Sequence, residues 1–259
     1  MRSILCPADA MEDFEERLQS ALALARVFGS HLTLQVATPV SEVLLYEPYG
    51  GVALSSAAVR EMRDADDAVA RALERRVAGE DVVCQVEQID AGRLEAAASA
   101  ARFADLVVIG RDDPVLEDLA LGVRCPVLAV PEGAPLLALD GPAMVAWDGG
   151  HEAANALRAA VPMLQRASAV TVVTVREKPS DFPAVQAMQY LARHGVVAEL
   201  REVPPVDGIA TTLLAEARRA GAKLVVMGVY GHSRLRELLL GGVTREMLGR
   251  AQVPLLIAH

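Results

Sequence analysis

Short apolar runs alternate with longer amphipathic segments along most of the chain. In the first half, strand-like apolar runs lie at 3–9, 31–37, 81–89, 104–110 and 125–130. Segments with the apolar spacing of a helix lie between them, at 12–28, 57–78 and 92–102. Residues 40–56 are rich in Pro, Gly and Tyr and are expected to form a long loop. This alternation predicts a parallel sheet whose strands are joined by right-handed helical crossovers.

The same order of elements returns in the second half. Strands are expected at 143–148, 169–175, 196–203, 224–227 and 254–258, and helices at 152–164, 182–194 and 209–220. Between the halves, residues 132–142 carry two prolines and two glycines, a composition typical of a linker. The pattern therefore predicts two domains, at 1–131 and 143–259, joined by 132–142.

An internal alignment supports this division. Asp9, at the end of the first strand, falls on Asp148, and the run 104–110 falls on 222–228. The first half is shorter than the second between its fourth and fifth strands. The missing residues are those that form a glycine-rich stretch in the second half.

Composition and charge narrow the classes of function. Hydrophobic residues make up 53% of the chain, which predicts a substantial core, and a net charge of −9 argues against nonspecific nucleic-acid binding. No apolar run approaches the roughly 18 residues of a membrane span, and the N-terminus turns acidic too soon for a signal peptide. Cys6, Cys84 and Cys125 lack metal-ligand spacing and are expected to be buried free thiols. We therefore expect a cytoplasmic protein.

Glycines follow the strand 224–227 at a regular spacing. Gly228 comes directly after this run, Gly231 follows, and Gly241 and Gly242 come ten residues later, before Val243 and Thr244. Glycines after a buried strand let backbone N–H groups approach an anion, and a helix N-terminus adds partial positive charge. We expect a helix to start at Gly242 and the stretch to bind phosphate. A tight turn and helix cap without a ligand is the alternative.

This spacing resembles the motif G-x2-G-x9-G-[ST] of the nucleotide-binding members of the universal stress protein family. Gly242 departs from the motif, because the family has Ser or Thr there, and Thr244 lies close enough in sequence to supply the hydroxyl. The resemblance covers nearly the whole chain. It implies an α/β fold of two tandem doubly wound domains, each a five-stranded parallel sheet flanked by helices, Rossmann-like and similar to adenine nucleotide alpha hydrolases. It also implies ATP as the ligand, alone or with Mg²⁺.

Further site residues follow from the strand ends. Asp148 ends the first strand of the second half, where a carboxylate can accept hydrogen bonds from a ribose or an adenine amino group. An Asp that caps the next helix is the alternative. The resemblance places a backbone contact to adenine near Val175. His232 and Ser233 can meet phosphate oxygens or form a solvated loop face.

The first half retains Asp9 but has a different exit from its fourth strand. Gly110 is followed by Arg111-Asp112-Asp113-Pro114. The two carboxylates would repel a triphosphate, and Pro114 removes a backbone donor. We expect a degenerate first domain and one competent site, in the second.

The sequence offers little support for enzyme chemistry. It contains no Ser/His/Asp order, no HExxH and no CxxC, so at most slow ATP hydrolysis is expected and no metal ligands are assigned. The leading hypothesis is an ATP-binding regulatory protein of the stress response. A nucleotide-free scaffold of the same fold, acting through protein contacts, is the alternative, and a hydrolase or transferase ranks third.

The resemblance also implies how the halves assemble. Single-domain members of the family pair through their fifth strands, which here are 126–130 and 254–258, both apolar and uncharged. Such a strand at an open sheet edge would promote aggregation. We therefore expect the two strands to pair within the chain, as an intramolecular pseudo-dimer, in a protein that is a monomer or homodimer.

Overall fold

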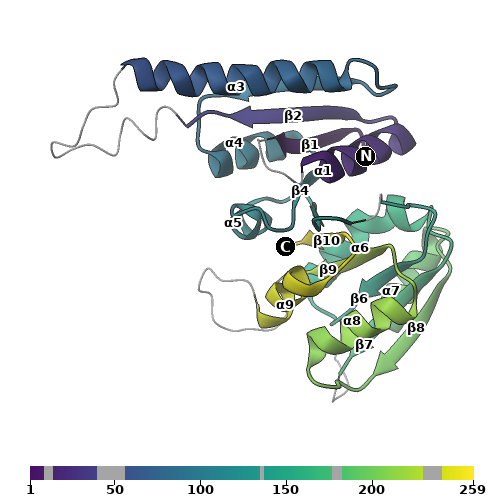
Figure 1. Cartoon of the computed structure of the whole chain (residues 1–259). Helices are drawn as coiled ribbons and strands as arrows, with labels where there is room; N and C mark the ends of the chain where they lie inside the picture. Colours follow the sequence, from purple (N-terminus) through teal and green to yellow (C-terminus); the bar gives the residue numbers. More distant parts are fainter. Residues whose placement is uncertain (9–13, 40–55, 135–136, 177–182, 230–240) are drawn as a thin grey trace. The chain divides into compact units, whose positions relative to one another are not determined.

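The computed structural model describes residues 1–8, 14–39, 56–134, 137–176, 183–229 and 241–259 (Figure 1). Asp9 lies outside these ranges, as does the predicted loop at 40–56 except for its last residue. The chain divides into two compact units, Met1–Ile109 and Gly110–His259. Both have strands and helices in alternation, so the predicted α/β fold with a mostly parallel sheet is confirmed.

The first unit is a parallel sheet in the order β3-β2-β1-β4. Its strands are β1 (Ser3–Ala8), β2 (His31–Ala37), β3 (Cys84–Ile89) and β4 (Leu106–Gly110). The flanking helices are α1 (Phe14–Phe28), α3 (Ser56–Val77), α4 (Arg93–Ala100) and the short 3-10 helix η1 (Ala101–Phe103). The buried residues of β1, β2 and β4 form the core of this unit, as expected for apolar runs in a parallel sheet.

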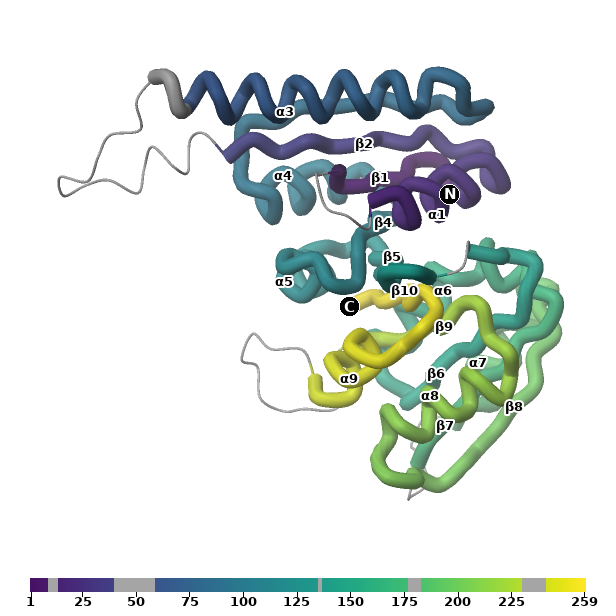
Figure 2. The backbone as a smooth tube through the Cα atoms, in the orientation of Figure 1, coloured from purple at the N-terminus to yellow at the C-terminus, as the bar shows by residue number. Residues whose placement is uncertain are grey.

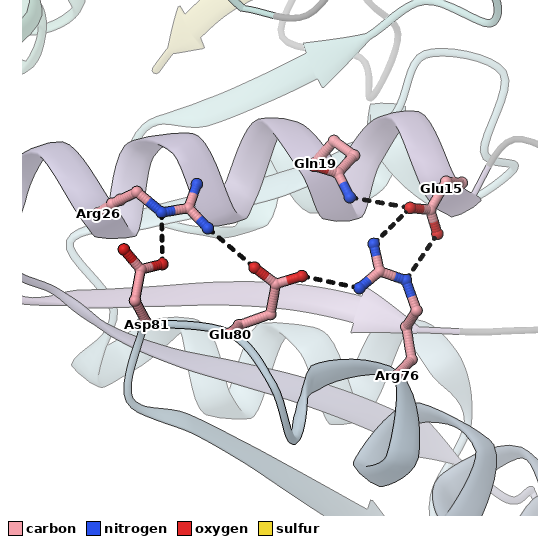
Figure 3. Close-up of polar contacts among 6 residues, drawn as sticks. All are labelled: Glu15, Gln19, Arg26, Arg76, Glu80 and Asp81. Carbon is pink, nitrogen blue, oxygen red and sulfur yellow. Dashed lines mark hydrogen bonds and ion pairs between the residues drawn. The ribbon is translucent and has the colours of Figure 1, made fainter.

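A chain of ion pairs ties α1 to the end of α3 (Figure 3). Glu15 of α1 pairs with Arg76 of α3 at 2.6 Å, and Arg76 pairs with Glu80 at 2.8 Å. Glu80 also pairs with Arg26, which binds Asp81 at 2.6 Å. The hydrogen bond from Arg76 lowers the pKa of Glu15, and that from Arg26 lowers the pKa of Asp81. The network is partly exposed, so each of its ion pairs contributes little to the free energy of unfolding.

The second unit has the strand order β5-β10-β9-β6-β7-β8. Its strands are β5 (Val127–Val130), β6 (Ala143–Ala146), β7 (Val170–Val175), β8 (Ala198–Val203), β9 (Leu224–Gly228) and β10 (Leu255–Ala258). Its helices are α5 (Leu116–Gly122), α6 (His151–Leu164), α7 (Val185–Arg193), α8 (Ile209–Arg219) and α9 (Gly242–Arg250). Helix α6 contacts α7, and α8 contacts α9, so these helices pack in two pairs.

The predicted pairing of the two fifth strands is confirmed. β5 and β10 lie side by side and run antiparallel, with Leu256 opposite Leu128 (Figure 2). Every other described strand pair in this unit is parallel. All four residues of each strand are buried, so neither apolar edge is left open to another chain.

Two segments differ from the sequence interpretation. Helix α5 is absent from the predicted elements, and it begins where the Asp113 carboxylate accepts the N–H of Val115 at 3.1 Å. In the predicted linker, Leu137 and Leu139 are buried, and the Lys223 N–H donates to the Pro142 carbonyl at 2.7 Å. This stretch therefore packs within the second unit, and the domain boundaries at 131 and 143 stay a prediction.

The cysteines form no disulfide among the described residues. Cys6 is buried, as expected, whereas Cys84 and Cys125 are only partly buried. Burial raises the pKa of the Cys84 thiol, so this group has little thiolate character. No helix in the described ranges combines the length and the apolarity needed to cross a membrane.

Candidate functional site

Three of the predicted site residues meet at one edge of the second sheet. β6, β7 and β9 are adjacent and parallel, and Ala146 of β6 lies opposite Val173 of β7 and Met227 of β9. Asp148 follows β6, Val175 is the last residue of β7 and Gly228 is the last residue of β9. The topology therefore brings them to the carboxyl edge, where ligands of doubly wound sheets bind.

Asp148 is exposed and shapes the turn between β6 and α6. Its Oδ1 accepts the N–H of Gly150 at 2.8 Å, and Gly149 between them has a φ of 88°. Gly150 is the N-cap residue of α6. The carboxylate thus orders the turn before α6, while a contact to a ribose or adenine and a helix cap both stay predictions.

Two buried donors lie beside the predicted adenine contact at Val175. Thr174, in β7, is 3% exposed, and Trp147, next to Asp148, is 8% exposed. The Thr174 hydroxyl and the Trp147 indole N–H have no hydrogen-bond partner among the described residues. Buried polar groups without partners are rare in folded proteins, so these two groups are candidates for contact with a ligand or water. The sequence interpretation missed both, although Trp147 is the one tryptophan of the chain.

Gly228 has a packing role that the sequence does not reveal. A Cβ atom at this position would lie 2.4 Å from the backbone nitrogen of Ala153 and 2.5 Å from the carbonyl carbon of Glu152. Both atoms belong to the first turn of α6, which therefore crosses the end of β9 at close range. Glycine is required here for the contact between helix and strand, whether or not a ligand approaches as well.

Helix α9 starts where the sequence predicts, with Gly241 as the N-cap and Gly242 as the first helical residue. The first i to i−4 bond joins the N–H of Arg245 to the Gly241 carbonyl at 3.0 Å. The N–H groups of Gly242, Val243 and Thr244 precede that bond and point out of the helix end. Since α9 connects β9 to the parallel strand β10, its N-terminus lies at the carboxyl edge of the sheet.

The two positions considered for the motif hydroxyl differ in environment. Gly242 is exposed, and a Cβ atom there would meet nothing within 4 Å. Thr244 is 4% exposed, so its side chain belongs to the packed face of α9. That Thr244 replaces the motif hydroxyl stays a prediction. Gly231, His232 and Ser233 lie outside the described residues.

In the first half, the segment after β4 corresponds to the glycine stretch after β9, but its side chains make structural contacts. After β4, Asp113 is 4% exposed and its carboxylate accepts the Val115 N–H, which caps the turn into α5. Arg111 pairs with Asp112 at 3.1 Å, and its Nη1 donates to the carbonyl of Ala251 at 2.8 Å. These polar side chains hold the local structure together. Among the described residues, no group of three or more His, Cys, Asp or Glu is placed to hold a metal ion.

The fold is that of a doubly wound α/β protein with a mostly parallel sheet. Residues 141–259, a little less than half of the chain, match the model of the universal stress protein family. No curated protein matches the chain in sequence.

Two solved structures share the fold over the full length. A universal stress protein from Archaeoglobus fulgidus DSM 4304 has 14% identity and a TM-score of 0.78, covering 99% of this chain and 97% of its own. A protein from Pseudomonas aeruginosa UCBPP-PA14, solved as a candidate universal stress protein, has 19% identity and a TM-score of 0.59, covering 100% of this chain and 93% of its own. At these identities the likeness concerns the fold.

Proposed function

We propose that this protein binds an adenine nucleotide, ATP, at the carboxyl edge of β6, β7 and β9 and acts as a regulatory protein of the stress response. One observation carries the proposal. The family-matching domain brings Asp148, Val175 and the N-terminus of α9 to the same sheet edge. A carboxylate suits a ribose or an adenine amino group, and a helix N-terminus suits phosphate.

Each group of the site has a distinct chemical task in this proposal. The Asp148 carboxylate accepts hydrogen bonds from the nucleoside, and the backbone near Val175 contacts the base. The N–H groups of Gly242, Val243 and Thr244 donate to phosphate oxygens. Mg²⁺, where it accompanies ATP, is expected to be held mainly by the phosphates, as is usual for this ion in nucleotide sites.

The proposal includes a single competent site per chain. Asp112 and Asp113 stand at the exit of β4, where the second half has its glycines. Asp113 is buried and bonded within its own turn, so the segment is already occupied by protein contacts. The family model matches 141–259, the half that carries the glycine motif.

A nucleotide-free scaffold is the second candidate, and three observations favour it. Gly228 is explained by its contact with α6, and Asp148 is explained by its bond to Gly150. Gly242 lacks the hydroxyl of the family motif. In this case the fold would act through protein contacts alone.

The test is a titration of the full chain with ATP, adenosine and GTP, combined with native mass spectrometry of the protein as purified from cells. Asp148→Asn is the informative variant, because the amide oxygen still accepts the Gly150 N–H while the charge is lost. We expect wild type to bind ATP and Asp148→Asn to bind both ATP and adenosine about tenfold more weakly, the value of one charge-assisted hydrogen bond. Absence of co-purified and titrated nucleotide would favour the scaffold.

A further inference from the structure

Helix α9 is held at its C-terminal end by an arginine from outside its own βαβ unit. Arg111 directly follows β4, and its backbone N–H donates to the carbonyl of Val130 in β5 at 2.8 Å. Its side chain reaches the C-cap residue of α9, where Nη1 donates to the Ala251 carbonyl at 2.8 Å. The side chain is 19% exposed, so this bond is largely shielded from water.

The hydrogen bond from Arg111 lies at the C-terminal end of α9, where it can stabilise the helix. The last carbonyls of a helix have no intrahelical partner and carry the negative end of the helix dipole. A guanidinium there satisfies one carbonyl and compensates the dipole at the same time. Because the Arg111 backbone is anchored to β5, the contact fixes the C-terminal end of α9 relative to the sheet.

The same segment also contacts the first turn of α9. Glu117 of α5 pairs with Arg245 at 3.6 Å, and both side chains are about half exposed. A pair this exposed contributes little energy. It shows, however, that residues from 110–122 lie against both ends of a helix only nine residues long.

The segment 110–122 occupies in the first half the place that 228–250 occupies in the second, since each joins a fourth strand to a fifth. We infer that this segment, having no phosphate loop of its own, serves as a brace that positions α9 for phosphate binding. Arg111 is the positioning residue of the brace. The role in phosphate binding rests on the proposed function, whereas the positioning of α9 rests on the hydrogen bond between Arg111 and Ala251.

The mechanical part can be tested without any nucleotide. Arg111→Met keeps the apolar length of the side chain and removes its donors, and Arg124→Met is the matched control, because it removes the same charge from an exposed position nearby. Amide hydrogen exchange of residues 242–250 in the full chain should be about tenfold faster in Arg111→Met, as expected for loss of one charged hydrogen bond. Arg124→Met and Glu117→Gln should exchange like wild type.

The functional part is tested by titrating ATP and adenosine into the same variants. Arg111→Met should weaken ATP about fivefold, within the usual range for a residue that acts at a distance. Adenosine affinity should stay unchanged, because adenosine does not reach the α9 N-terminus. Arg111→Lys, which retains a charged donor, should lie between wild type and Arg111→Met, and it replaces Arg111→Met if that variant does not fold.

The outcomes separate the brace from the proposed function. Unchanged exchange over α9 in Arg111→Met overturns the brace. An equal loss of ATP and adenosine affinity overturns its role in phosphate binding, because a general loosening of the unit would then explain the result. If wild type binds no nucleotide, the proposed function fails, and the exchange of α9 alone decides whether Arg111 holds the helix.

Discussion

Replacing Gly228 by Ala tests whether this glycine serves the fold or a ligand. The added Cβ would lie 2.4 Å from the backbone nitrogen of Ala153 and 2.5 Å from the carbonyl carbon of Glu152. Both are backbone atoms in the first turn of α6, so no side chain can rotate away to make room. Either α6 or the end of β9 must move.

The expected cost follows from overpacking at a rigid contact. Extra methylenes in a packed interior cost about 1–3 kcal/mol, and we expect the upper end, about 3 kcal/mol, because backbone must shift. For a unit of this size, that corresponds to a decrease in Tm of about 9 °C. Trp147 is the one tryptophan of the chain and is buried in the second unit, so its fluorescence during urea or thermal unfolding follows this unit.

Gly242→Ala is the matched control, since a Cβ there meets nothing within 4 Å. Its stability should stay within about 0.5 kcal/mol of wild type, as for other unstrained surface substitutions. If Gly228→Ala proves as stable as wild type, the close approach of α6 to β9 is refuted. A stable Gly228→Ala protein that has lost ATP binding would assign the glycine to the ligand instead.

Three further predictions concern the site, the ion pairs and the fifth strands. Gly242→Ser places a hydroxyl at the exposed start of α9 and should raise the affinity for ATP about tenfold, as expected for one added hydrogen bond to a charged group. An unchanged or lower affinity in the titration would mean that another group already supplies this hydrogen bond. The pKa values of Glu15 and Asp81 are lowered in the folded state from their unfolded values of 4.5 and 3.8. The ionised carboxylates therefore stabilise the fold above those unfolded values, and this stabilisation is lost as the pH falls through the lower, folded pKa values. Urea unfolding at pH 7 and pH 3 should therefore show a smaller acid loss in Arg76→Met than in wild type, and an equal loss would exclude the network. A fragment of residues 1–131 lacks β10, so its β5 edge is exposed and the fragment should self-associate in a sedimentation experiment. The intact chain should be no larger than a dimer. A soluble, strictly monomeric fragment would show that β5 does not need to pair with β10.

The sequence predicts the regular elements well, for a simple physical reason. Strands buried on both faces of a parallel sheet are continuous apolar runs, so β4 and β9 can be located to within two residues. The start of α9 at Gly242 is also predicted correctly, from the position of the glycine pair. The pairing of β5 with β10 is what the resemblance to universal stress proteins implies, and the apolar, uncharged character of both strands agrees with it.

Other features depend on contacts that no local pattern encodes. Helix α5 has seven residues, too few for helical periodicity, and the Asp113 carboxylate accepts an N–H in the turn before it. The bond from Arg111 to Ala251 joins residues 140 positions apart. In the sequence, Arg111 is only a departure from the glycine motif, whereas in the structure it donates a hydrogen bond to the C-terminal end of α9.

Candidate site residues divide in the same way. The strand ends place Asp148, Val175 and Gly228 at one edge, as the order of elements predicts. The bond of Asp148 to Gly150 and the approach of α6 to Gly228 depend on three-dimensional packing, and they give these residues structural roles that spacing alone cannot distinguish from ligand binding.

The central claim is one adenine-nucleotide site, in the second half. Hydrogen exchange of the full chain with and without saturating ATP tests it most directly, because binding to the folded state at a hundredfold excess over Kd stabilises that state by about 2.7 kcal/mol. The account predicts protection concentrated at 228–248, with little change at 110–124. Equal protection of both segments would contradict a single competent site, and protection in neither would contradict nucleotide binding itself.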